Sequence, residues 1–266
     1  MQPLSPYADI KARSVSGPRG RFRFSRFDVA AGTKIRNHGH DNWHVFMLLG
    51  GDMEQAAGEN SVTVKKAGVR VSSKDRRHAI DFGAEGGRCL VLHVADASMM
   101  AGFESSASAG DFFTHDEKVV RALAEASHQL ADITAAPLLD LKVKEALNRL
   151  RLLGSGCLEA PPPWLEETRM RLESSDKPVS IASLADAAGV RREHFSRRFR
   201  HYFGYAPSEY SSAQRLAKAL RLLAGGAATQ AEVAAEAGYF DQSHLTHSLR
   251  RALGVVPSQI RVAEHS

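Results

Sequence analysis

The chain has 266 residues, of which 43% are hydrophobic and 24% charged, and its formal net charge at pH 7 is +5. This composition is that of a folded protein, and it excludes wholesale disorder or a collagen-like structure. No apolar run approaches the roughly 20 residues of a membrane span, and we expect no signal peptide at the start of the chain. Two cysteines, Cys89 and Cys157, cannot form a disulfide framework in a chain of this length. We therefore expect a cytoplasmic protein without a membrane partner.

The amino-terminal part of the chain, from residue 21 to about 94, has the pattern of short β-strands. Apolar and β-branched runs such as 62–64 and 69–71 alternate with glycine-rich turns such as Gly50-Gly51. Several short strands separated by such turns predict a β-sandwich or barrel. Residues 101–113 are small and polar, which is typical of a loop.

After about residue 115 the apolar residues follow a helical period. One amphipathic stripe covers 119–130 and a second covers 138–150. Pro161-Pro162-Pro163 then forms a stiff linker, and the chain from Trp164 onward reads as helical throughout. We therefore predict an α+β two-domain fold, a β-barrel with flanking helices followed by an all-α domain. The predicted segments are a β-barrel at 1–112, linking helices at 113–160 and a helical domain at 164–266.

The helical domain contains one unit twice, at a spacing of about fifty residues. Residues 184–189 and 233–238 each place an apolar residue, an alanine and a glycine at the same offsets, with one carboxylate in between. Each unit later reaches a glycine and a proline, at 204–207 and at 254–257. A short helix, a glycine-bearing turn and a second amphipathic helix predict a helix-turn-helix, whose second helix enters the major groove of DNA. The two predicted units span about residues 180–204 and 229–254.

Residues 164–263 closely resemble the DNA-binding domain of the AraC/XylS family of bacterial transcription regulators. The most distinctive stretch is 234–245, followed by Gly254 and Pro257. The segment from Gln214 to Leu223 resembles the family's long helix that connects the two motifs. The resemblance implies a sequence-specific transcription regulator that places two recognition helices in successive major grooves of double-stranded DNA.

Recognition-helix residues near the amino-terminal end are the ones that reach base edges. Arg197 is the best candidate for a bidentate contact to guanine, and Glu193 either accepts from cytosine or is solvated. His247 occupies the position of Arg197 in the second unit, which makes that unit less basic. Five arginines and one glutamate lie between Arg191 and Arg200, a density typical of a phosphate-binding surface or of a solvated helix face. The predicted DNA-binding residues are Arg191, Arg192, Glu193, Ser196, Arg197, Arg200, Gln242, Ser243, Thr246 and His247.

A cluster of histidines lies in the strand-rich region. The spacing from Gly32 through His38, His40 and His44 to Gly51 resembles the first motif of the cupin barrel, with His44 in place of a glutamate. The AraC/XylS family usually carries a cupin-like barrel as its amino-terminal sensor, so the two resemblances support each other. The helices at 113–160 are then expected to pack against the barrel, and the resemblance also implies a role for them in forming a homodimer.

The histidines themselves suggest a metal site. His38 and His40, two residues apart on a strand, point to one face, and His44 joins them if the strand is regular. His78, in a loose match to a second cupin motif, is expected opposite them. These imidazoles suit Zn, Ni, Fe or Mn as a divalent ion. Further candidate ligands are Glu54 and His93. The alternative is a metal-free polar pocket that binds an anionic effector.

We therefore predict a DNA-binding regulator, not an enzyme, that is controlled by a small-molecule or metal effector in the cupin-like domain. One alternative is a metallocupin enzyme, such as a dioxygenase or isomerase, fused to a DNA-binding domain, and the histidines motivate it. Another is an architectural DNA-binding protein without an effector. Turnover of a substrate would distinguish the first alternative, and DNA affinity that no metabolite or metal changes would distinguish the second.

Overall fold

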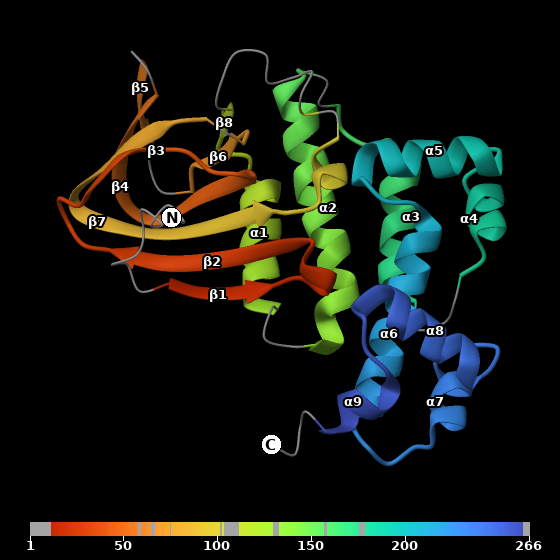
Figure 1. Ribbon diagram of the computed structural model, residues 1–266. Coiled ribbons are helices and arrows are strands. Elements are labelled where there is room, and N and C mark those ends of the chain that lie inside the picture. Colours follow the sequence, from red (N-terminus) through yellow and green to blue (C-terminus); the bar gives the residue numbers. More distant parts are fainter. Residues whose placement is uncertain are drawn as a thin grey trace. The chain divides into compact units, whose positions relative to one another are not determined.

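A computed structural model gives the three-dimensional structure of the chain (Figure 1). The residues that it describes are 12–57, 60–64, 67–74, 76–101, 103, 112–129, 133–156, 159–175 and 179–262. They form two compact units, Met1–Ser127 and His128–Ser266. The first is rich in strands and the second is helical, which confirms the predicted α+β class with two domains. Among the described helices, none combines the length and the apolar character that crossing a membrane requires.

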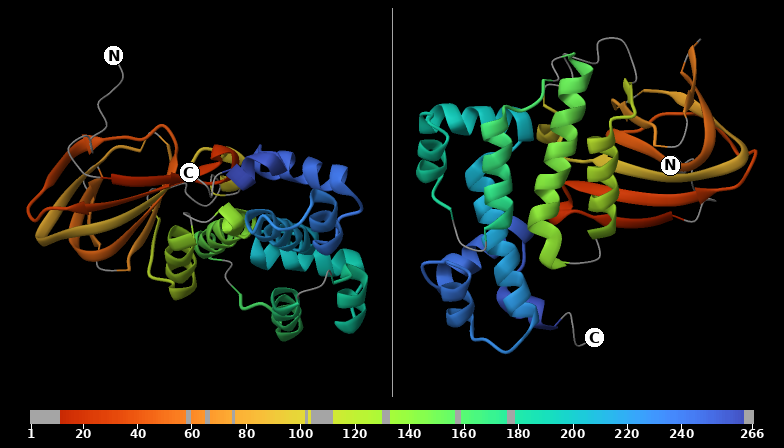
Figure 2. Two further views of the ribbon diagram at one scale, coloured as in Figure 1. Left: turned by 90° about the horizontal axis from the view of Figure 1, so that it is seen from below. Right: turned by 180° about the vertical axis from the view of Figure 1, so that it is seen from behind.

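Among the described residues of the first unit, eight strands form one sheet, and every pairing between them is antiparallel (Figures 1 and 2). The order is β1-β2-β7-β4-β6-β8, with β3 also on β7 and β5 also on β4. The strands are β1 (Ala12–Ser16), β2 (Phe22–Val29), β3 (Lys34–His38), β4 (Trp43–Ala57), β5 (Asn60–Val64), β6 (Val69–Ser72), β7 (His78–Val94) and β8 (Phe112–Thr114). The loop predicted over 101–113 lies mostly outside the described residues, and its last two residues begin β8.

The strands β4 and β7 are long and bend together, so each has two different sets of neighbours. β4 continues through Gly50-Gly51, where the sequence predicts a turn, and its register with β7 shifts there. Gly51 has a φ of 84°, and a Cβ atom at this position would lie 2.0 Å from the carbonyl oxygen of Gly86. Only glycine tolerates both the positive φ and the close approach of two backbones. The glycine pair therefore allows a bend within one continuous strand.

One face of the sheet, called the inner face below, carries the apolar core of this unit. Its members alternate along the strands, as the two-residue period of a strand requires. They are Phe27, Val29, Ile35, Phe46, Leu48, Met53, Val64, Ile80, Phe82, Cys89 and Val91.

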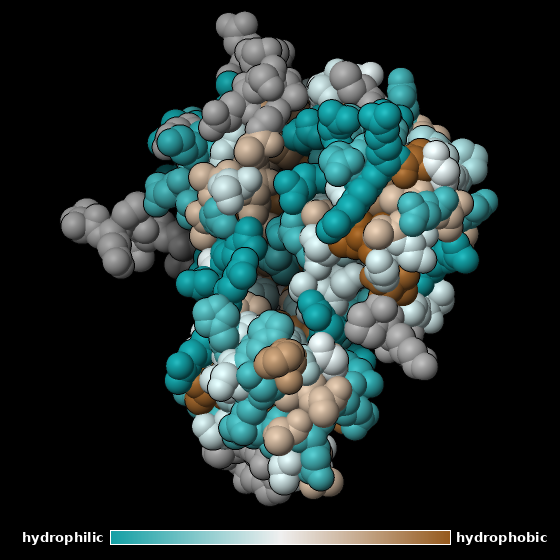
Figure 3. Space-filling model, turned by 90° about the vertical axis from the view of Figure 1, so that its right-hand side faces the viewer, coloured by the Kyte–Doolittle hydropathy of each residue, from teal (hydrophilic) through white to brown (hydrophobic). Residues whose placement is uncertain are grey.

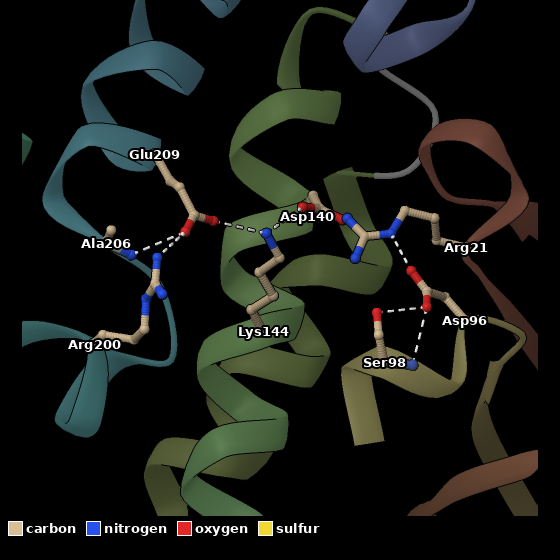
Figure 4. Close-up of polar contacts among 8 residues, drawn as sticks. All are labelled: Arg21, Asp96, Ser98, Asp140, Lys144, Arg200, Ala206 and Glu209. Carbon is tan, nitrogen blue, oxygen red and sulfur yellow. Dashed lines mark hydrogen bonds and ion pairs between the residues drawn. The ribbon is translucent and has the colours of Figure 1, made fainter. Parts of the chain in front are cut away.

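The unit also contains the short 3-10 helices η1 (Pro18–Gly20) and η2 (Ala97–Met100) and the helix α1 (Glu117–Gln129). Where β2 begins and β7 ends, Arg21 Nε donates to Asp96 Oδ2 over 2.8 Å, and Asp96 Oδ1 caps η2 through Ser98 (Figure 4).

The second unit is helical in all of its described elements. They are η3 (Ile133–Ala135), α2 (Ala136–Gly154), α3 (Pro163–Ser174), α4 (Ile181–Ala187), α5 (Arg192–Phe203), α6 (Pro207–Ala224), α7 (Gln230–Glu236), α8 (Gln242–Leu253) and α9 (Pro257–Val262). Two apolar clusters share the central helix α6. One includes Phe195 and Phe199 of α5, and the other includes Leu245 and Leu249 of α8. The helix α2 packs on α5 and α6 within this unit. The predicted role of α1 and α2 in dimerisation stays a prediction.

Candidate functional site

The helices α4 and α5 form the first helix-turn-helix. Ser180 caps α4 by accepting from the backbone N–H of Ser183. Gly189, with a φ of 66°, makes the turn, and Gly204, with a φ of 78°, ends α5 in the left-handed conformation. Phe195 and Phe199 are fully buried one turn apart. They attach α5 to α6 and leave its opposite face exposed.

The helices α7 and α8 form the second helix-turn-helix with the same local devices. Thr229 and Glu232 make a capping box at the start of α7. Gly238 makes the turn with a φ of 80°, and Asp241 caps α8 by accepting from the His244 N–H over 2.7 Å. Gly254 ends α8 with a φ of 78°, the value found at the end of α5. The two units therefore repeat in structure as well as in sequence.

The predicted DNA-binding residues lie on exposed or half-buried positions of these helices. The sequence of burial classes over 191–200 is identical, position by position, to that over 241–250. In both stretches the fifth and ninth residues are buried and the sixth and eighth are half-buried. Arg197 and His247 occupy equivalent exposed positions. None of the predicted DNA-binding residues is buried: Arg191, Arg192, Glu193, Ser196, Arg197 and Arg200, with Gln242, Ser243, Thr246 and His247.

Some of these side chains already have partners. Arg200 forms an ion pair with Glu209 over 3.1 Å, and Gln242 Nε2 donates to Gln230 Oε1 over 2.7 Å. Arg197 has no ion pair with any residue that the structure describes, so its guanidinium can turn toward a base without breaking one. The surface that carries this unit is mostly hydrophilic, with only small hydrophobic areas (Figure 3). Such a surface fits a polar ligand better than an apolar partner.

The carboxy-terminal end of α5 is held by α2. Asn148 Nδ2 donates to the carbonyl oxygens of His201 and Tyr202, over 2.9 and 3.2 Å. Lys144 contacts both Asp140 and Glu209, over 3.2 and 3.0 Å. The bonds from Asn148 satisfy carbonyl groups that the end of α5 leaves without an intrahelical partner. The first recognition helix is thereby attached to a helix outside its own motif.

The structure also brings the predicted histidines together on the inner face of the sheet. Ligand atoms of His38, His40 and His78 all lie within 4.8 Å of one another. The ring centroids of His40 and His44 are 4.1 Å apart, and those of His40 and His93 are 6.4 Å apart. The residues come from different elements, because β3 ends at His38 and His40 lies in the connection before β4. The single regular strand expected from the spacing is therefore not the arrangement that forms the cluster.

Backbone carbonyls orient two of these imidazoles. His38 Nδ1 lies 2.8 Å from the carbonyl oxygen of Arg36, and His78 Nδ1 lies 3.4 Å from that of Arg76. A carbonyl only accepts, so Nδ1 carries the proton in each ring and Nε2 keeps its lone pair. Histidines that bind metals are oriented in this way by a second hydrogen bond. His44 Nδ1 is buried and forms no hydrogen bond within the part of the chain that the structure describes.

Burial lowers the pKa of every imidazole in the cluster. Desolvation is the largest cause, and it lowers the pKa of His40 to about 4, that of His78 to about 3 and that of His93 to about 4. The pKa values of His38 and His44 are lowered for the same reason. All five rings are therefore neutral at pH 7, the form in which imidazole binds a metal.

Sequence reasoning missed two polar side chains beside the histidines. Arg70 is 1% exposed, and its Nη1 donates to Gln55 Oε1 over 2.6 Å. The positive charge of Arg70 further lowers the pKa of His40 and His78. Arg70 lies in β6, where all four residues are buried, and it pairs with Phe46 of the inner face. This pairing joins distant segments, so no local pattern in the sequence marks Arg70.

The structure corrects the prediction for Glu54. Glu54 is exposed and hydrogen-bonds to Ser61, whereas its neighbour Gln55 is buried on the inner face. Successive residues of a strand point to opposite faces, so Glu54 and Gln55 cannot both reach the histidines. The carboxylate is therefore absent from the cluster, which consists of imidazoles with an amide and a guanidinium nearby.

Comparisons with known proteins agree with the geometry of the helical unit. A family model described as a helix-turn-helix domain matches residues 184–263. A putative AraC-like transcription regulator of Streptomyces lividans is 38% identical over 82 residues, which are 31% of this chain and 27% of that protein. The virulence regulon transcriptional activator VirF of Yersinia enterocolitica is 30% identical over 118 residues, 44% of this chain and 41% of that protein. The chain thus spans less than half the length of these relatives.

Two solved structures match the chain at low sequence identity. ToxT from Vibrio cholerae, in the apo K231A form, is 13% identical with a TM-score of 0.43, over 92% of this chain and 98% of that one. The cupin domain of Cnp3 from Schizosaccharomyces pombe is 22% identical with a TM-score of 0.31, over 34% of this chain and 63% of that one.

The paired motifs on a shared helix define the carboxy-terminal unit as a double helix-turn-helix domain of the DNA-binding class. The match of that domain to AraC-like regulators shows which proteins it is related to. Residues 184–263 are therefore similar to the DNA-binding domains of AraC-like transcription regulators.

Proposed function

We propose that the protein is a cytoplasmic, sequence-specific DNA-binding transcription regulator. The observation that carries this proposal is the shared pattern of exposure on α5 and α8, two helices joined by α6. α6 has 18 residues and is therefore about 27 Å long. Successive major grooves on one side of DNA are about 34 Å apart, and the offsets of the two flanking helices supply the difference. The double motif therefore fits two adjacent grooves of double-stranded DNA.

The exposed side chains have different roles in this proposal. Arg197 donates two hydrogen bonds to a guanine, and Glu193 accepts from a cytosine. Gln242 reads an adenine once its contact with Gln230 opens. Ser196, Ser243, Thr246 and His247 line the same grooves. Arg191, Arg192 and Arg200 contact phosphates, which give affinity without sequence preference.

Selection of binding sites from a pool of random double-stranded DNA tests this proposal with the full chain. We expect enrichment of a site with two half-sites whose centres are about one helical turn apart. Binding of the enriched site, measured by fluorescence anisotropy, should exceed binding of unrelated DNA by about a thousandfold or more. Equal affinity for both DNAs would overturn sequence-specific recognition.

We further propose that the histidine cluster is the effector site and holds a divalent transition metal. His38, His40 and His78 supply neutral imidazoles, and His44 is a fourth donor. The fit rests on the ligand atoms of His38, His40 and His78, which lie within 4.8 Å of one another, and on the unpartnered Nδ1 of His44. Imidazole donors suit Zn, Ni, Fe and Mn. When bound, such an ion would supply a positive centre that polarises an oxygen ligand.

Elemental analysis of the untagged protein, purified without chelator, tests the metal site. We expect about one metal ion per chain, lost in the His38→Ala/His40→Ala variant. DNA affinity should then change when that metal is titrated into the apo protein, because a regulator must bind its effector unequally in two states. A protein that stays metal-free after reconstitution would instead direct a thermal-shift screen of small anions, for which Arg70 is the nearby cation.

The same cluster favours one second candidate, a metallocupin enzyme fused to the DNA-binding domain. Neutral imidazoles that bind a metal also occur in catalytic metal sites. The reloaded protein would then convert a substrate of the dioxygenase or isomerase type. Turnover lost in the His38→Ala/His40→Ala variant would support this candidate, and a bound metal without turnover would not.

A further inference from the structure

A pocket lies at the base of the first helix-turn-helix, within the helical unit. It has a volume of about 290 Å³ and is formed by the start of α4, the first residue of α5 and one side of α6. Its lining residues are Val179, Ser180, Ile181, Ala182, Arg192, Ser208, Ser211, Ser212 and Arg215. The α6 members are spaced three, four and seven residues after Ser208, so they share one face of that helix.

The chemistry of the pocket favours an anion. Its lining contains two arginines and four serines and no carboxylate. The Arg215 guanidinium stands 5.8 Å from the centroid of the Tyr239 ring, and its Nη2 donates to Ser212 Oγ over 3.4 Å. Its Nε is buried and forms no hydrogen bond with any residue that the structure describes. Arg215 is therefore oriented by its neighbours and still has a donor to give.

The serine hydroxyls add donors of their own. Ser212 Oγ accepts from Arg215, so its hydrogen remains to be donated, and Ser180 Oγ accepts from the Ser183 N–H in the same way. Ser211 differs, because it already donates to the carbonyl oxygen of Pro207 over 3.3 Å. Hydroxyl donors with two guanidinium groups match the oxygens of a phosphate group.

We infer that this pocket binds a phosphate of the DNA backbone, a contact that rests on the proposed DNA-binding function. Arg192 is the first residue of the recognition helix α5, so the pocket opens beside the groove that α5 reads. α6 connects the two recognition helices, and the backbone that separates two successive grooves runs past a helix in that position. The phosphate is thereby held at a fixed distance from the bases that contact α5.

The second motif lacks the same chemistry. Gln242 stands at the position of Arg192, and it is hydrogen-bonded to Gln230 over 2.7 Å. A neutral amide pair therefore replaces an arginine at the start of α8. The phosphate pocket belongs to the first motif, which then contributes more of the salt-dependent affinity.

The test measures the salt dependence of DNA binding by the full chain, on the selected site and on unrelated DNA. We expect Arg215→Ala to weaken both complexes about fivefold at 0.15 M salt and to reduce the slope of log K against log salt by about one. Arg221→Ala removes an exposed arginine of the same helix that does not line the pocket, and it should leave the slope unchanged. An unchanged slope in Arg215→Ala would overturn the inference.

A second variant covers the risk that Arg215→Ala disturbs folding. Ser208→Asp adds a negative charge at the second position of α6, where an acidic residue suits the helix. We expect a melting temperature near that of the wild type and weaker binding of both DNAs, because the carboxylate repels a phosphate. A Ser208→Asp variant that binds both DNAs like the wild type would contradict the pocket. Wild-type protein without specific binding would instead contradict the proposed function itself.

Free phosphate is the other source of the same chemistry. Inorganic phosphate, compared with chloride at equal ionic strength, should compete only weakly with DNA if the pocket is built for the backbone. A large rise in melting temperature with phosphate, lost in Arg215→Ala while the DNA salt slope stays at the wild-type value, would overturn the backbone assignment in favour of a free anion.

Discussion

The recognition helices α5 and α8 are matched in burial and differ in charge. Their ten-residue stretches 191–200 and 241–250 have the same burial class at every position, and each helix ends at a glycine with a φ of 78°. The first stretch carries five arginines and one glutamate, whereas the second carries one arginine and one aspartate. The shared core positions determine which side chains face outward. The charge of the outward side chains is then free to differ, so the first motif supplies most of the electrostatic attraction to DNA.

The attachment of the two helices also differs. α5 is held at its end by Asn148 and by the ion pairs around Lys144. After α8, the bond that follows is a local one at the start of α9, where the Val256 N–H donates to Gln259 Oε1 over 2.8 Å. A movement of α2 would therefore change the position of α5 directly, through these contacts. The comparison gives the following tests, which start with the largest expected effect.

Removal of a core ring should break the shared scaffold. Phe199 is fully buried between α5 and α6, and Phe199→Ala should lower the free energy of unfolding by about 3–5 kcal/mol. Leu249→Ala, at the equivalent position of α8, should cost about 2–4 kcal/mol because fewer atoms are lost. Urea denaturation measures both, with the exposed His194→Ala as the control. Costs under 1 kcal/mol would show that these residues are not the core of their motifs.

Substitutions at the exposed positions should weaken DNA binding by different amounts in the two motifs. Arg197→Ala should cost about 1–3 kcal/mol of binding free energy on the selected site and relax base preference in one half-site. His247→Ala should cost less, because an imidazole lacks the two parallel N–H donors with which a guanidinium contacts a guanine. Anisotropy titrations with single-base variants of the site measure both effects. A larger loss for His247→Ala would reverse the proposed order of the two motifs.

The link from α2 should matter for the first motif alone. Asn148→Ala removes two hydrogen bonds to the end of α5 and should lower the free energy of unfolding by about 1–1.5 kcal/mol. Base preference should relax in the half-site that α5 reads and stay intact in the other. Equal relaxation in both half-sites, measured by repeating the site selection, would argue against a direct connection from α2 to α5.

Removal of the side chains that cap α4 and α7 should give the smallest difference in stability between the two motifs. Thr229 is part of a capping box, and Thr229→Ala should cost about 1 kcal/mol of stability. Ser180 accepts one bond of 3.4 Å, so Ser180→Ala should cost about 0.5 kcal/mol. Thermal unfolding followed by circular dichroism resolves the difference. Equal costs would mean that the second partner of the capping box, Glu232, contributes nothing measurable.

The helical unit was predictable from sequence because its signals are local. Gly189 and Gly238 mark turns, and the apolar spacing from Phe195 to Phe199 marks the buried face. The histidine cluster was predicted as well, although His40 lies outside the regular strand on which the spacing argument rests. The residue types were sufficient for this prediction even though the expected strand geometry was wrong.

The parts that were missed depend on pairing between distant strands. Gly50-Gly51 reads as a turn, and only the close approach of Gly86 shows that β4 bends and continues. The face of Glu54 depends on the register across that bend. Arg70 is a lone arginine in a strand, a residue type that is usually exposed, and its burial follows from its pairing with Phe46. Long-range register of this kind cannot be read from a short segment.

The two glycines that end the recognition helices form a matched pair for engineering. A methyl group at Gly204 would lie 2.7 Å from Asn148 Cβ and 2.8 Å from the Lys144 carbonyl oxygen, whereas one at Gly254 would meet no atom within 4 Å. Both positions have the same φ, so alanine imposes the same backbone strain at each. The difference between the two alanine variants isolates a steric wedge between α2 and α5. Gly204 is therefore a position at which one added carbon atom would separate α5 from α2 without changing any residue that faces DNA.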